Sequence, residues 1–494
     1  PDEFEVYFQV EHLADAGDIS VPQALQIRQP VIVDGKVVGT QSMFFGKVGR
    51  DGKPYAPYGP LAAVLALPHH LAGRAIAGVL GVPRLPPSQG LAWVILVGGL
   101  TMLATATAAA LAVAGFYRAA LALGTPSRFA LTLSLLLGGA TVLWPYGTSF
   151  YTEAWQAATL TWAAALLLEA RAAPATAMRR VILASALLTV TGLTKVTSLV
   201  FVPGFIVAVL LAGSISTGRR MRSAIALATG ISTAVVIHLV WNQYRFGSAF
   251  DFGYDWSETI PVLPPQTFSL AEAPRGLAVL LASPGKSLFV WAPVLVLAAL
   301  SGVRFWRREP AVAVGILTTF GLGLIFYAAY LFPEGGYSHG PRHLVPIVPL
   351  LLLLATGADA REWPRAAILA CATLGATVAI LATAVSFLDD QAMSGDARAP
   401  QRTSYYERID PASGRAINRY RLGYVPFRTA TSTPGWVAAP VLGQGPDYHP
   451  LHLQQARRQL RDGQNIPAWF PWVWPAMWAA VLVVTARWLA SNSR

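Results

Sequence analysis

Long apolar runs separated by short basic segments limit the fold of this chain more than any other feature of the sequence. A helix needs roughly 20 apolar residues to cross a hydrocarbon core about 30 Å thick, and the sequence holds eleven runs near or somewhat below that length. They lie near residues 90–116, 129–146, 154–171, 180–194, 197–213, 222–243, 287–303, 311–331, 344–359, 366–388 and 469–490. With 54% hydrophobic and only 13% charged residues, the chain cannot cover a water-facing surface of its size. The sequence therefore predicts an all-α polytopic membrane protein with about eleven spans.

The basic residues lie mainly between these runs, and 32 of them are arginines against five lysines. If runs 180–194 and 197–213 form a hairpin rather than one kinked helix, the arginine clusters share one side of the membrane. The clusters are Arg118/Arg128, Arg171/Arg179/Arg180, Arg219/Arg220/Arg222, Arg304/Arg307/Arg308 and Arg361/Arg365, with Arg487 and Arg494. Such an excess marks the cytoplasmic side. The net charge of +12 therefore indicates membrane topology rather than nucleic-acid binding, and the Ala-, Gly- and Arg-rich composition favours a bacterial cytoplasmic (inner) membrane.

The stretch from Leu61 to Val82 could be a further span, but we expect one or two amphipathic helices on the outer surface. It contains two histidines, Arg74 and Pro68, and counting it as a span would invert every later loop. The chain then begins outside the membrane. We therefore expect another span to precede Pro1, which would give twelve in all.

The remaining segments divide the chain into four parts. Residues 1–89 are expected to form a first extracytoplasmic loop with interfacial helices, and Asp34-Gly35 between alternating residues indicates a small β-hairpin in it. The other parts are a transmembrane core at 90–388, an extracytoplasmic insertion at 389–468, and a last span with a cytoplasmic tail at 469–494. The single cysteine excludes an intrachain disulfide.

Several ionisable residues fall at the outer ends of the expected spans. Asp2-Glu3 opens the first loop, Glu153 opens a span, and Lys195 interrupts the apolar hairpin. A charge at membrane depth is costly, so each of these residues is a candidate for function. The simpler explanation for the acids is a favourable position at a helix N-terminus, whereas an isolated lysine there needs an anion.

More cations fall on the same face of the membrane. Arg342 lies in a segment with His339, and Arg245 and Lys286 each follow an apolar run. Arginine offers a planar charge that suits phosphate oxygens, although lipid headgroups are an alternative partner. Carboxylates and cations that converge on an outer cavity suit the transfer of a group from a phosphate carrier, because the acid can deprotonate a hydroxyl while the cations stabilise the departing phosphate.

The sequence lacks the common soluble-enzyme motifs. There is no phosphate-binding glycine loop followed by Lys-Ser/Thr, no Gly-x-Ser-x-Gly and no cysteine pair for zinc. His69-His70, and His339 with His343, could ligate a metal, but histidines at a membrane boundary are more often interfacial side chains.

In order and common sidedness, these residues resemble the GT-C superfamily of polyprenyl-phosphate-sugar-dependent glycosyltransferases, near the protein mannosyltransferase and lipid A aminoarabinose transferase families and their bacterial relatives. The resembling segments are Asp2-Glu3, the Tyr/Pro-rich stretch from Tyr55 through Tyr58 to Pro60, Glu153, Leu193-Thr194-Lys195, Arg245–Ser248, Ser283–Lys286 and Gly340–His343. The resemblance implies a GT-C-like helical bundle whose first external loop carries surface helices.

The resemblance also implies roles for individual residues. Asp2 would be the general base on an acceptor hydroxyl, which attacks the sugar of a polyprenyl-phosphate donor with inversion. Glu3 and Glu153 would position the acceptor or base, or bind a divalent cation. Lys195 and Arg342 would hold the lipid phosphate. Further candidates for the phosphate are Arg245, Lys286 and His339, and for the acceptor loop Tyr55 and Tyr58.

Some features stay open at this point. No Asp-x-Asp metal signature accompanies these residues, so the metal dependence is unassigned, and the acceptor could be a glycan, a lipid or a protein. An O-antigen-ligase-like transferase would depend on arginine and histidine instead of an acidic base. A lipid or polysaccharide transporter would place its site near the bilayer midplane. A non-catalytic scaffold subunit is a further alternative.

Overall fold

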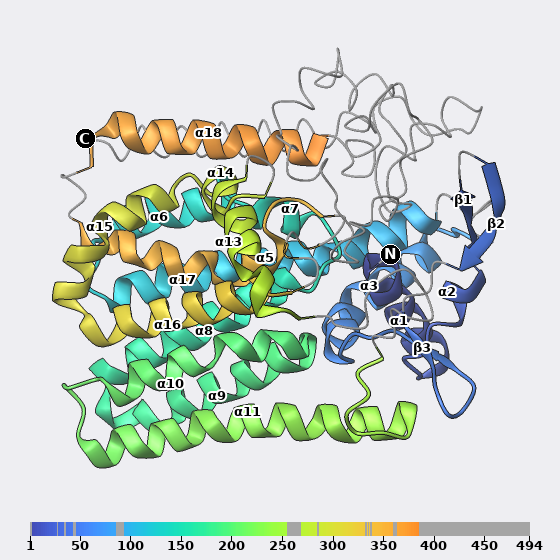
Figure 1. Ribbon diagram of the computed structural model, residues 1–494, viewed down its shortest axis with the longest axis horizontal. Helices are drawn as coiled ribbons and strands as arrows, with labels where there is room; N and C mark the ends of the chain where they lie inside the picture. The colour runs from blue at the N-terminus through green and yellow to red at the C-terminus, as the bar shows by residue number, and fades with distance from the viewer. Residues whose placement is uncertain are drawn as a thin grey trace.

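The computed structural model describes residues 2–26, 28–33, 36–42, 46–84, 93–253, 268–283, 286–330, 333, 335, 338–358 and 363–384. Within these residues the chain is almost entirely helical, with two small antiparallel sheets of two strands each. The long helices lie side by side in a bundle, and the N-terminal elements gather at one end of it (Figure 1). The all-α polytopic membrane architecture predicted from the sequence is confirmed.

The N-terminal elements pack around a small apolar core of their own. They are α1 (Asp2–Ala16), α2 (Pro22–Gln26), β1 (Arg28–Val33), β2 (Lys36–Ser42), β3 (Lys47–Val48), β4 (Pro54–Tyr55) and α3 (Leu61–Val79). Val6 and Val10, one helical turn apart on α1, are buried against Ala62 and Ala66 of α3. Strands β1 and β2 pair antiparallel from Arg28↔Ser42 to Val33↔Lys36, which confirms the predicted hairpin.

The bundle follows, and several short or 3-10 segments interrupt it. In chain order its elements are the π-helix η1 (Val94–Gly98), α5 (Gly99–Ala122), α6 (Ser127–Gly139), α7 (Leu143–Gly147), α8 (Glu153–Ala172), η2 (Pro174–Thr176), α9 (Ala177–Thr194), η3 (Val196–Phe201), α10 (Pro203–Leu210), α11 (Thr217–Phe246), η4 (Leu270–Glu272), α13 (Ala273–Ala282), α14 (Leu288–Trp291), α15 (Leu295–Arg308), α16 (Pro310–Ala328), η5 (Arg342–Ile347), α17 (Val348–Leu352), η6 (Leu353–Gly357) and α18 (Arg365–Ala384).

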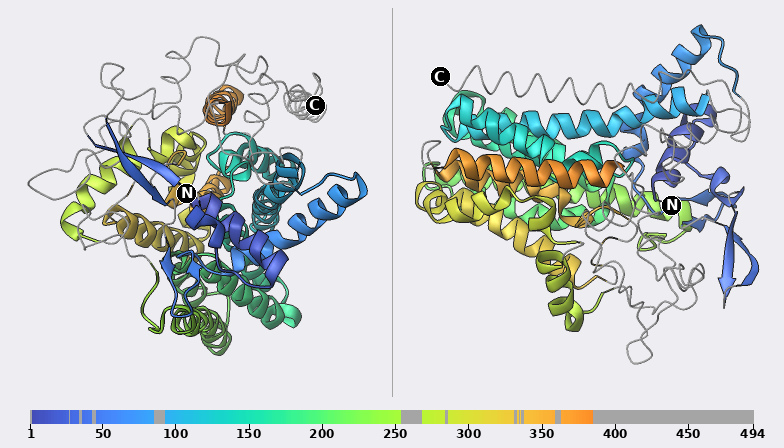
Figure 2. Two further views of the ribbon diagram at one scale, coloured as in Figure 1. Left: turned by 90° about the vertical axis from the view of Figure 1, so that its right-hand side faces the viewer. Right: turned by 90° about the horizontal axis from the view of Figure 1, so that it is seen from above.

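Five helices among the described residues are long and apolar enough to cross a membrane. They are Leu61–Val79, Leu96–Ala122, Pro174–Thr194, Thr217–Phe246 and Pro310–Ala328. The first of these is α3, which runs obliquely to the bundle axis at the end where α1 lies (Figure 2). Its assignment to the membrane surface rather than to a span stays a prediction, as does the exact number of spans.

The structure decides whether the runs 180–194 and 197–213 form a hairpin or one kinked helix. Lys195 is extended, with φ −159° and ψ 117°, and separates α9 from η3 and α10. Helices α9 and α10 then run in opposite directions along the bundle (Figure 1). The segment is therefore a hairpin and not one kinked helix.

Two predicted spans are broken rather than continuous helices. The run near 344–359 consists of η5, α17 and η6, because Pro346 lies inside η5 and Pro349 lies at the start of α17, and proline removes an amide donor. The run near 287–303 is interrupted between α14 and α15 at Ala292-Pro293. The predicted insertion at 389–468 and the last span at 469–490 lie outside the described residues.

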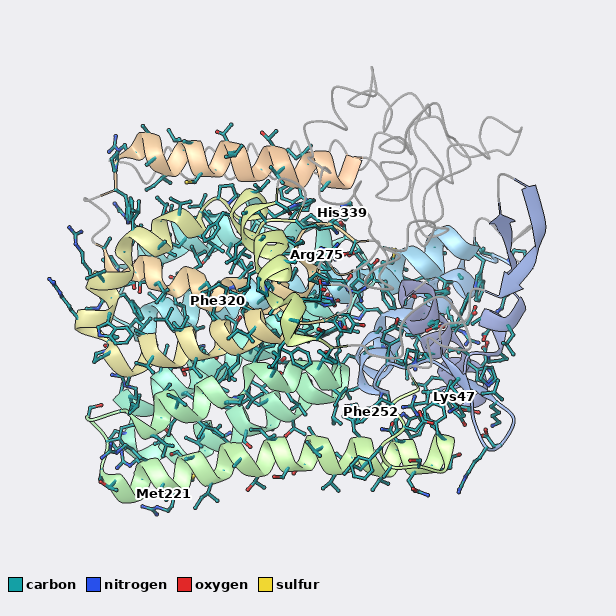
Figure 3. All side chains as sticks on the ribbon, in the orientation of Figure 1. Lys47, Met221, Phe252, Arg275, Phe320 and His339 are labelled. Atoms are coloured by element: carbon teal, nitrogen blue, oxygen red, sulfur yellow. The ribbon has the colours of Figure 1, made fainter. Side chains whose placement is uncertain are left out.

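Arginines gather at one end of the bundle, where ion pairs join the ends of neighbouring helices. Arg118 binds Glu169 at 2.6 Å, and Arg171 binds Glu309 at 2.8 Å. Met221 lies at this end, whereas Phe252 and Lys47 lie at the other (Figure 3). The described members of the clusters therefore share one end, as the predicted threading requires, whereas Arg361, Arg487 and Arg494 lie outside the described residues. The identity of that end as the cytoplasmic one stays a prediction.

Small residues allow the helices to approach closely. In lipid the hydrophobic effect does not drive helices together, so contact between small side chains takes over. A Cβ on Gly204 of α10 would lie 2.1 Å from Thr319 Oγ1 and 2.4 Å from the Gly315 carbonyl oxygen of α16. Helices α10 and α16 are therefore packed backbone against backbone at this crossing.

We expect Gly204→Ala to lower the thermal unfolding temperature of the purified protein in detergent, because the added methyl forces α10 and α16 apart at a cost of about 1–3 kcal/mol. Gly218→Ala is the matched control, since Gly218 is also the second residue of its helix and a Cβ there meets nothing within 4 Å. Equal effects of the two substitutions would contradict the close crossing.

Candidate active site

Three charged residues from distant parts of the sequence meet inside the bundle. Glu153 Oε1 accepts hydrogen bonds from Lys195 Nζ at 3.0 Å and from Arg342 Nε at 2.8 Å. The residues are only 1%, 9% and 6% exposed, respectively. The structure therefore brings together the predicted acid and the two leading phosphate-binding candidates.

Local structure explains the position of Glu153. It is the first residue of α8, where the unpaired amides and the helix dipole favour a carboxylate. Thr152 precedes it and accepts a hydrogen bond from the Gln156 side chain at 3.0 Å. The buried carboxylate therefore lies where the helix itself contributes positive potential.

The break in the hairpin presents Lys195. Thr194 Oγ1 donates to the Thr191 carbonyl oxygen at 2.7 Å, and Ser198 Oγ lies 2.6 Å from the Lys195 carbonyl oxygen. These hydroxyls bond carbonyl oxygens that the ending helix leaves open. The His238 side chain of α11 lies 2.8 Å from the Gly192 carbonyl oxygen, which ties the end of α9 to a second helix.

The segment that carries Arg342 is fixed by glycine and aromatic contacts. Gly340 has φ +54°, and a Cβ there would lie 2.6 Å from the Trp291 indole, so both the conformation and the space require glycine. The Arg342 guanidinium lies 4.1 Å from the centre of the Tyr151 ring, a favourable cation–π contact. Tyr151 belongs to the segment that leads into Glu153, so one segment contacts Arg342 twice.

Lys286 and His339 join the same segment. The Lys286 ammonium donates to the Ser338 carbonyl oxygen, and the Tyr146 hydroxyl donates to that of His339 at 2.8 Å. Lys286 and His339 are 2% and 3% exposed. Both predicted residues are therefore placed beside Arg342, where their contacts support the backbone before it.

Desolvated cations converge on one carboxylate. Lys195 and Arg342 share Glu153 Oε1, and the ammonium of Lys286 is buried beside the Arg342 segment. Glu153 Oε2 is buried without a hydrogen-bond partner among the described residues. Because desolvation strengthens the attraction of these cations for negative charge, the arrangement favours the binding of an anion.

Arg245 and Tyr55 lie in a different cluster. Arg245 donates to the Ala56 carbonyl oxygen at 2.7 Å and to Asn242 at 2.8 Å. Tyr55 donates to Asp51 at 2.8 Å, and burial together with this hydrogen bond raises the pKa of Tyr55 above its usual range. These contacts attach the first loop to the end of α11, which gives Arg245 a structural role.

The first loop nevertheless reaches the hairpin that presents Lys195. A Cβ on Gly59 would lie 2.0 Å from the Leu193 carbonyl oxygen, so only glycine fits there. Its neighbour Tyr58 is buried with residues of α1 and with Phe150. The Tyr/Pro-rich stretch therefore packs between α1 and the Lys195 turn.

Helix α1 lies over the segment that leads into Glu153. The Tyr7 ring is 6.4 Å from the ring of Phe150, which lies three residues before Glu153. Helix α1 begins at Asp2, although the side chains of Asp2 and Glu3 lie outside the described part of the structure. The structure shows where their helix begins, and the roles of Asp2 and Glu3 stay predictions.

The described side chains that could bind a metal ion do not gather into one site. The described part of the chain contains no group of three His, Cys, Asp or Glu residues arranged for a metal ion. His69 and His70 hydrogen-bond Thr107 and Thr101, and His343 stacks on Tyr327 at 4.4 Å.

Sequence reasoning missed the aromatic residues of the site. Tyr146 and Tyr151 flank the cluster, and Trp291 closes against Gly340. The sequence signal for Tyr146 and Tyr151 was the aromatic-rich link between two spans at 144–151, because Trp and Tyr are enriched where a span meets the membrane surface.

No protein-family model matches the sequence, and no curated protein matches it. Three solved structures resemble the fold. ArnT from Cupriavidus metallidurans matches in the apo state, with 16% identity and a TM-score of 0.45, over 94% of this chain and 67% of that one. Its structure bound to undecaprenyl phosphate matches with 14% identity and a TM-score of 0.46, over 94% of this chain and 68% of that one.

The third likeness is to the archaeal oligosaccharyltransferase AglB from Archaeoglobus fulgidus, solved with an inhibitory peptide and a dolichol-phosphate. It has 11% identity and a TM-score of 0.37, over 84% of this chain and 56% of that one. ArnT and AglB are both GT-C proteins, the superfamily that the sequence motifs resemble. At these identities the functional assignment depends on the residues of this chain.

We expect Glu153→Gln to destabilise the protein by about 3–5 kcal/mol, because two buried cations lose their shared carboxylate. The double variant Glu153→Gln/Lys195→Met should recover part of this loss, since one of the unpaired cations is removed. Thermal unfolding in detergent measures both. Glu272→Gln, which disturbs a partly exposed ion pair with Arg275, should change stability by at most about 1 kcal/mol.

The effects of Glu153→Gln and Lys195→Met on the free energy of unfolding should not add in the double variant. Strict additivity would contradict an energetic coupling between these two charges.

Proposed function

We propose that this chain is an integral-membrane glycosyltransferase that moves a sugar from a polyprenyl-phosphate carrier to an acceptor hydroxyl, with inversion at the anomeric carbon. The observation that carries the proposal is the buried cluster in which Lys195 and Arg342 share one oxygen of Glu153. Its two desolvated cations suit a phosphate, and its position inside a membrane bundle suits a phosphate attached to a lipid.

The reaction breaks the bond between the anomeric carbon and the phosphate oxygen and forms a bond to the acceptor oxygen. The phosphate gains a negative charge as it leaves. Lys195 and Arg342, desolvated by burial, stabilise that charge more strongly than they would in water. Glu153 keeps both cations in place before the lipid binds, so little reorganisation accompanies the reaction.

The proton of the acceptor hydroxyl goes to a carboxylate. The resemblance of Asp2-Glu3 to the acidic motif of GT-C proteins assigns this role to Asp2, with Glu3 beside it. The contact between Tyr7 of α1 and Phe150 supports this assignment, because it brings the helix that begins at Asp2 to the segment before Glu153. Tyr58 would line the acceptor side through the same core.

Glu153 offers a divalent cation at most one free carboxylate oxygen. A metal site requires several carboxylate or carbonyl oxygens. Glu153 Oε1 is already shared by two cations, whereas Oε2 has no hydrogen-bond partner among the described residues. If the reaction uses a divalent cation, Glu3 and Glu153 would be its ligands, as the resemblance implies.

The arginine-rich end of the bundle would face the cytoplasm. Glu153 is the first residue of α8, whereas Arg171 lies in its last turn. Lys195 follows the end of α9, whereas Arg179 and Arg180 lie near its start. The cluster and these arginines are therefore at opposite ends of the same two helices. The reaction would then take place on the extracytoplasmic side of a bacterial inner membrane.

Activity can be tested without knowing the natural acceptor. The purified full chain is incubated with a panel of polyprenyl-phosphate sugars and a cell-envelope extract, and release of the polyprenyl phosphate is measured by mass spectrometry. We expect Asp2→Asn to lower release by about 100-fold or more, as for the loss of a general base. Lys195→Met and Arg342→Met should each lower it by about 100-fold or more, because each removes a donor to the leaving group.

The controls separate the competing functions. Arg245→Lys keeps the charge of a residue outside the cluster and should retain most of the activity. Full activity of Asp2→Asn would favour a ligase-like transferase that depends on arginine and histidine. Transport of the unmodified lipid-linked sugar into the lumen of proteoliposomes, with no release of polyprenyl phosphate, would instead identify a transporter.

A further inference from the structure

An apolar groove lies between α8, α10 and α16, and neither Glu153, Lys195 nor Arg342 lines it. It has about 820 Å³ of empty space, including its open part. All but four of its lining residues are apolar or glycine. The groove is therefore suited to a hydrocarbon chain and not to a sugar or nucleotide.

Small residues create this space. Ala164 of α8, Ala208 of α10 and Ala311 of α16 face the groove, where longer side chains would fill it. Toward the middle of the bundle it is closed by the tight crossing of Gly204 with Gly315 and Thr319. The close helix crossing therefore bounds the groove where Gly204, Gly315 and Thr319 line it.

The other end of the groove is basic. Its remaining polar lining residues are Arg171, Arg219 and Ser223. Arg171 is paired with Glu309 at 2.8 Å. Arg219 and Ser223 lie one turn apart on α11, and Arg219 makes no side-chain hydrogen bond or ion pair with any described residue. A cation that no described residue pairs with therefore lies at the edge of an apolar groove.

The surroundings strengthen the positive potential at this edge. Arg220 and Arg222 follow Arg219 directly, and Arg220 donates to the Leu210 carbonyl oxygen at 3.0 Å, which fixes the loop beside the groove. Basic pockets between membrane helices favour the headgroups of anionic lipids, and guanidinium groups suit phosphate oxygens.

We propose that this groove binds an anionic phospholipid, with one acyl chain between α8, α10 and α16 and its phosphate at Arg219. The site differs in chemistry from the charged cluster at Glu153, because it combines a long apolar wall with the partly buried cations Arg171 and Arg219. It would hold together helices that otherwise leave a void at the arginine-rich end.

Thermal unfolding of the full chain in detergent, titrated with dioleoyl phosphatidylglycerol or dioleoyl phosphatidylcholine, tests the proposal. We expect the anionic lipid to raise the unfolding temperature at a lower concentration than the zwitterionic one. Arg219→Gln should raise the half-saturating concentration of phosphatidylglycerol about fivefold, as expected for the loss of one cation near a lipid phosphate.

Two further variants make the test specific. Arg307→Gln removes an exposed charge from the same end, outside the groove, and should leave the response unchanged. Ala164→Leu fills the groove without changing charge and should remove the stabilisation. Equal responses to the two lipids, equal behaviour of the Arg219 and Arg307 variants, or full stabilisation of Ala164→Leu would each overturn the proposal.

Discussion

The rest of the site depends on a single carboxylate oxygen shared by two cations. Glu153 Oε1 joins Lys195, 42 residues later, and Arg342, 189 residues later. A buried pair of one carboxylate and one cation would be neutral and would not attract an anion. The second cation allows the cluster to bind an anion. The carboxylate lowers the free-energy cost of burying both cations when no ligand is bound, since uncompensated buried charges are strongly destabilising.

The fold provides this arrangement through interruptions in regular helices. Glu153 begins a helix, Lys195 lies in the break of a hairpin, and Arg342 begins a 3-10 segment after Gly340. Irregular backbone inside a membrane protein is tolerated where protein or a cavity surrounds it. Here Trp291 and the serine and threonine hydroxyls near Lys195 supply the required contacts, so the breaks are specified by packing and hydrogen bonds.

The sequence predicted those parts that local pattern encodes. Apolar runs predicted the bundle, Asp34-Gly35 predicted the hairpin, and the cost of charge at membrane depth selected Glu153 and Lys195. Pro346 and Pro349 are a local signal for the break in the run after Arg342, which the prediction of a span overlooked. That Tyr151 lies under the guanidinium could not be predicted. This contact joins segments far apart in the chain, for which the local periodicity carries no signal.

The same limit applies to Arg245. Its position at an outer helix end is equally compatible with a phosphate ligand and with a structural anchor. The hydrogen bond to Ala56 shows the structural contact, and the phosphate role stays a prediction.

A structure of the full chain in lipid nanodiscs with a polyprenyl phosphate would test the central claim most directly. The account predicts phosphate density within hydrogen-bond distance, about 3 Å, of the Lys195 ammonium and the Arg342 guanidinium, with Glu153 still contacting both. Phosphate bound only at Arg245 or only at the arginine-rich end, with the cluster at Glu153 unchanged, would contradict it.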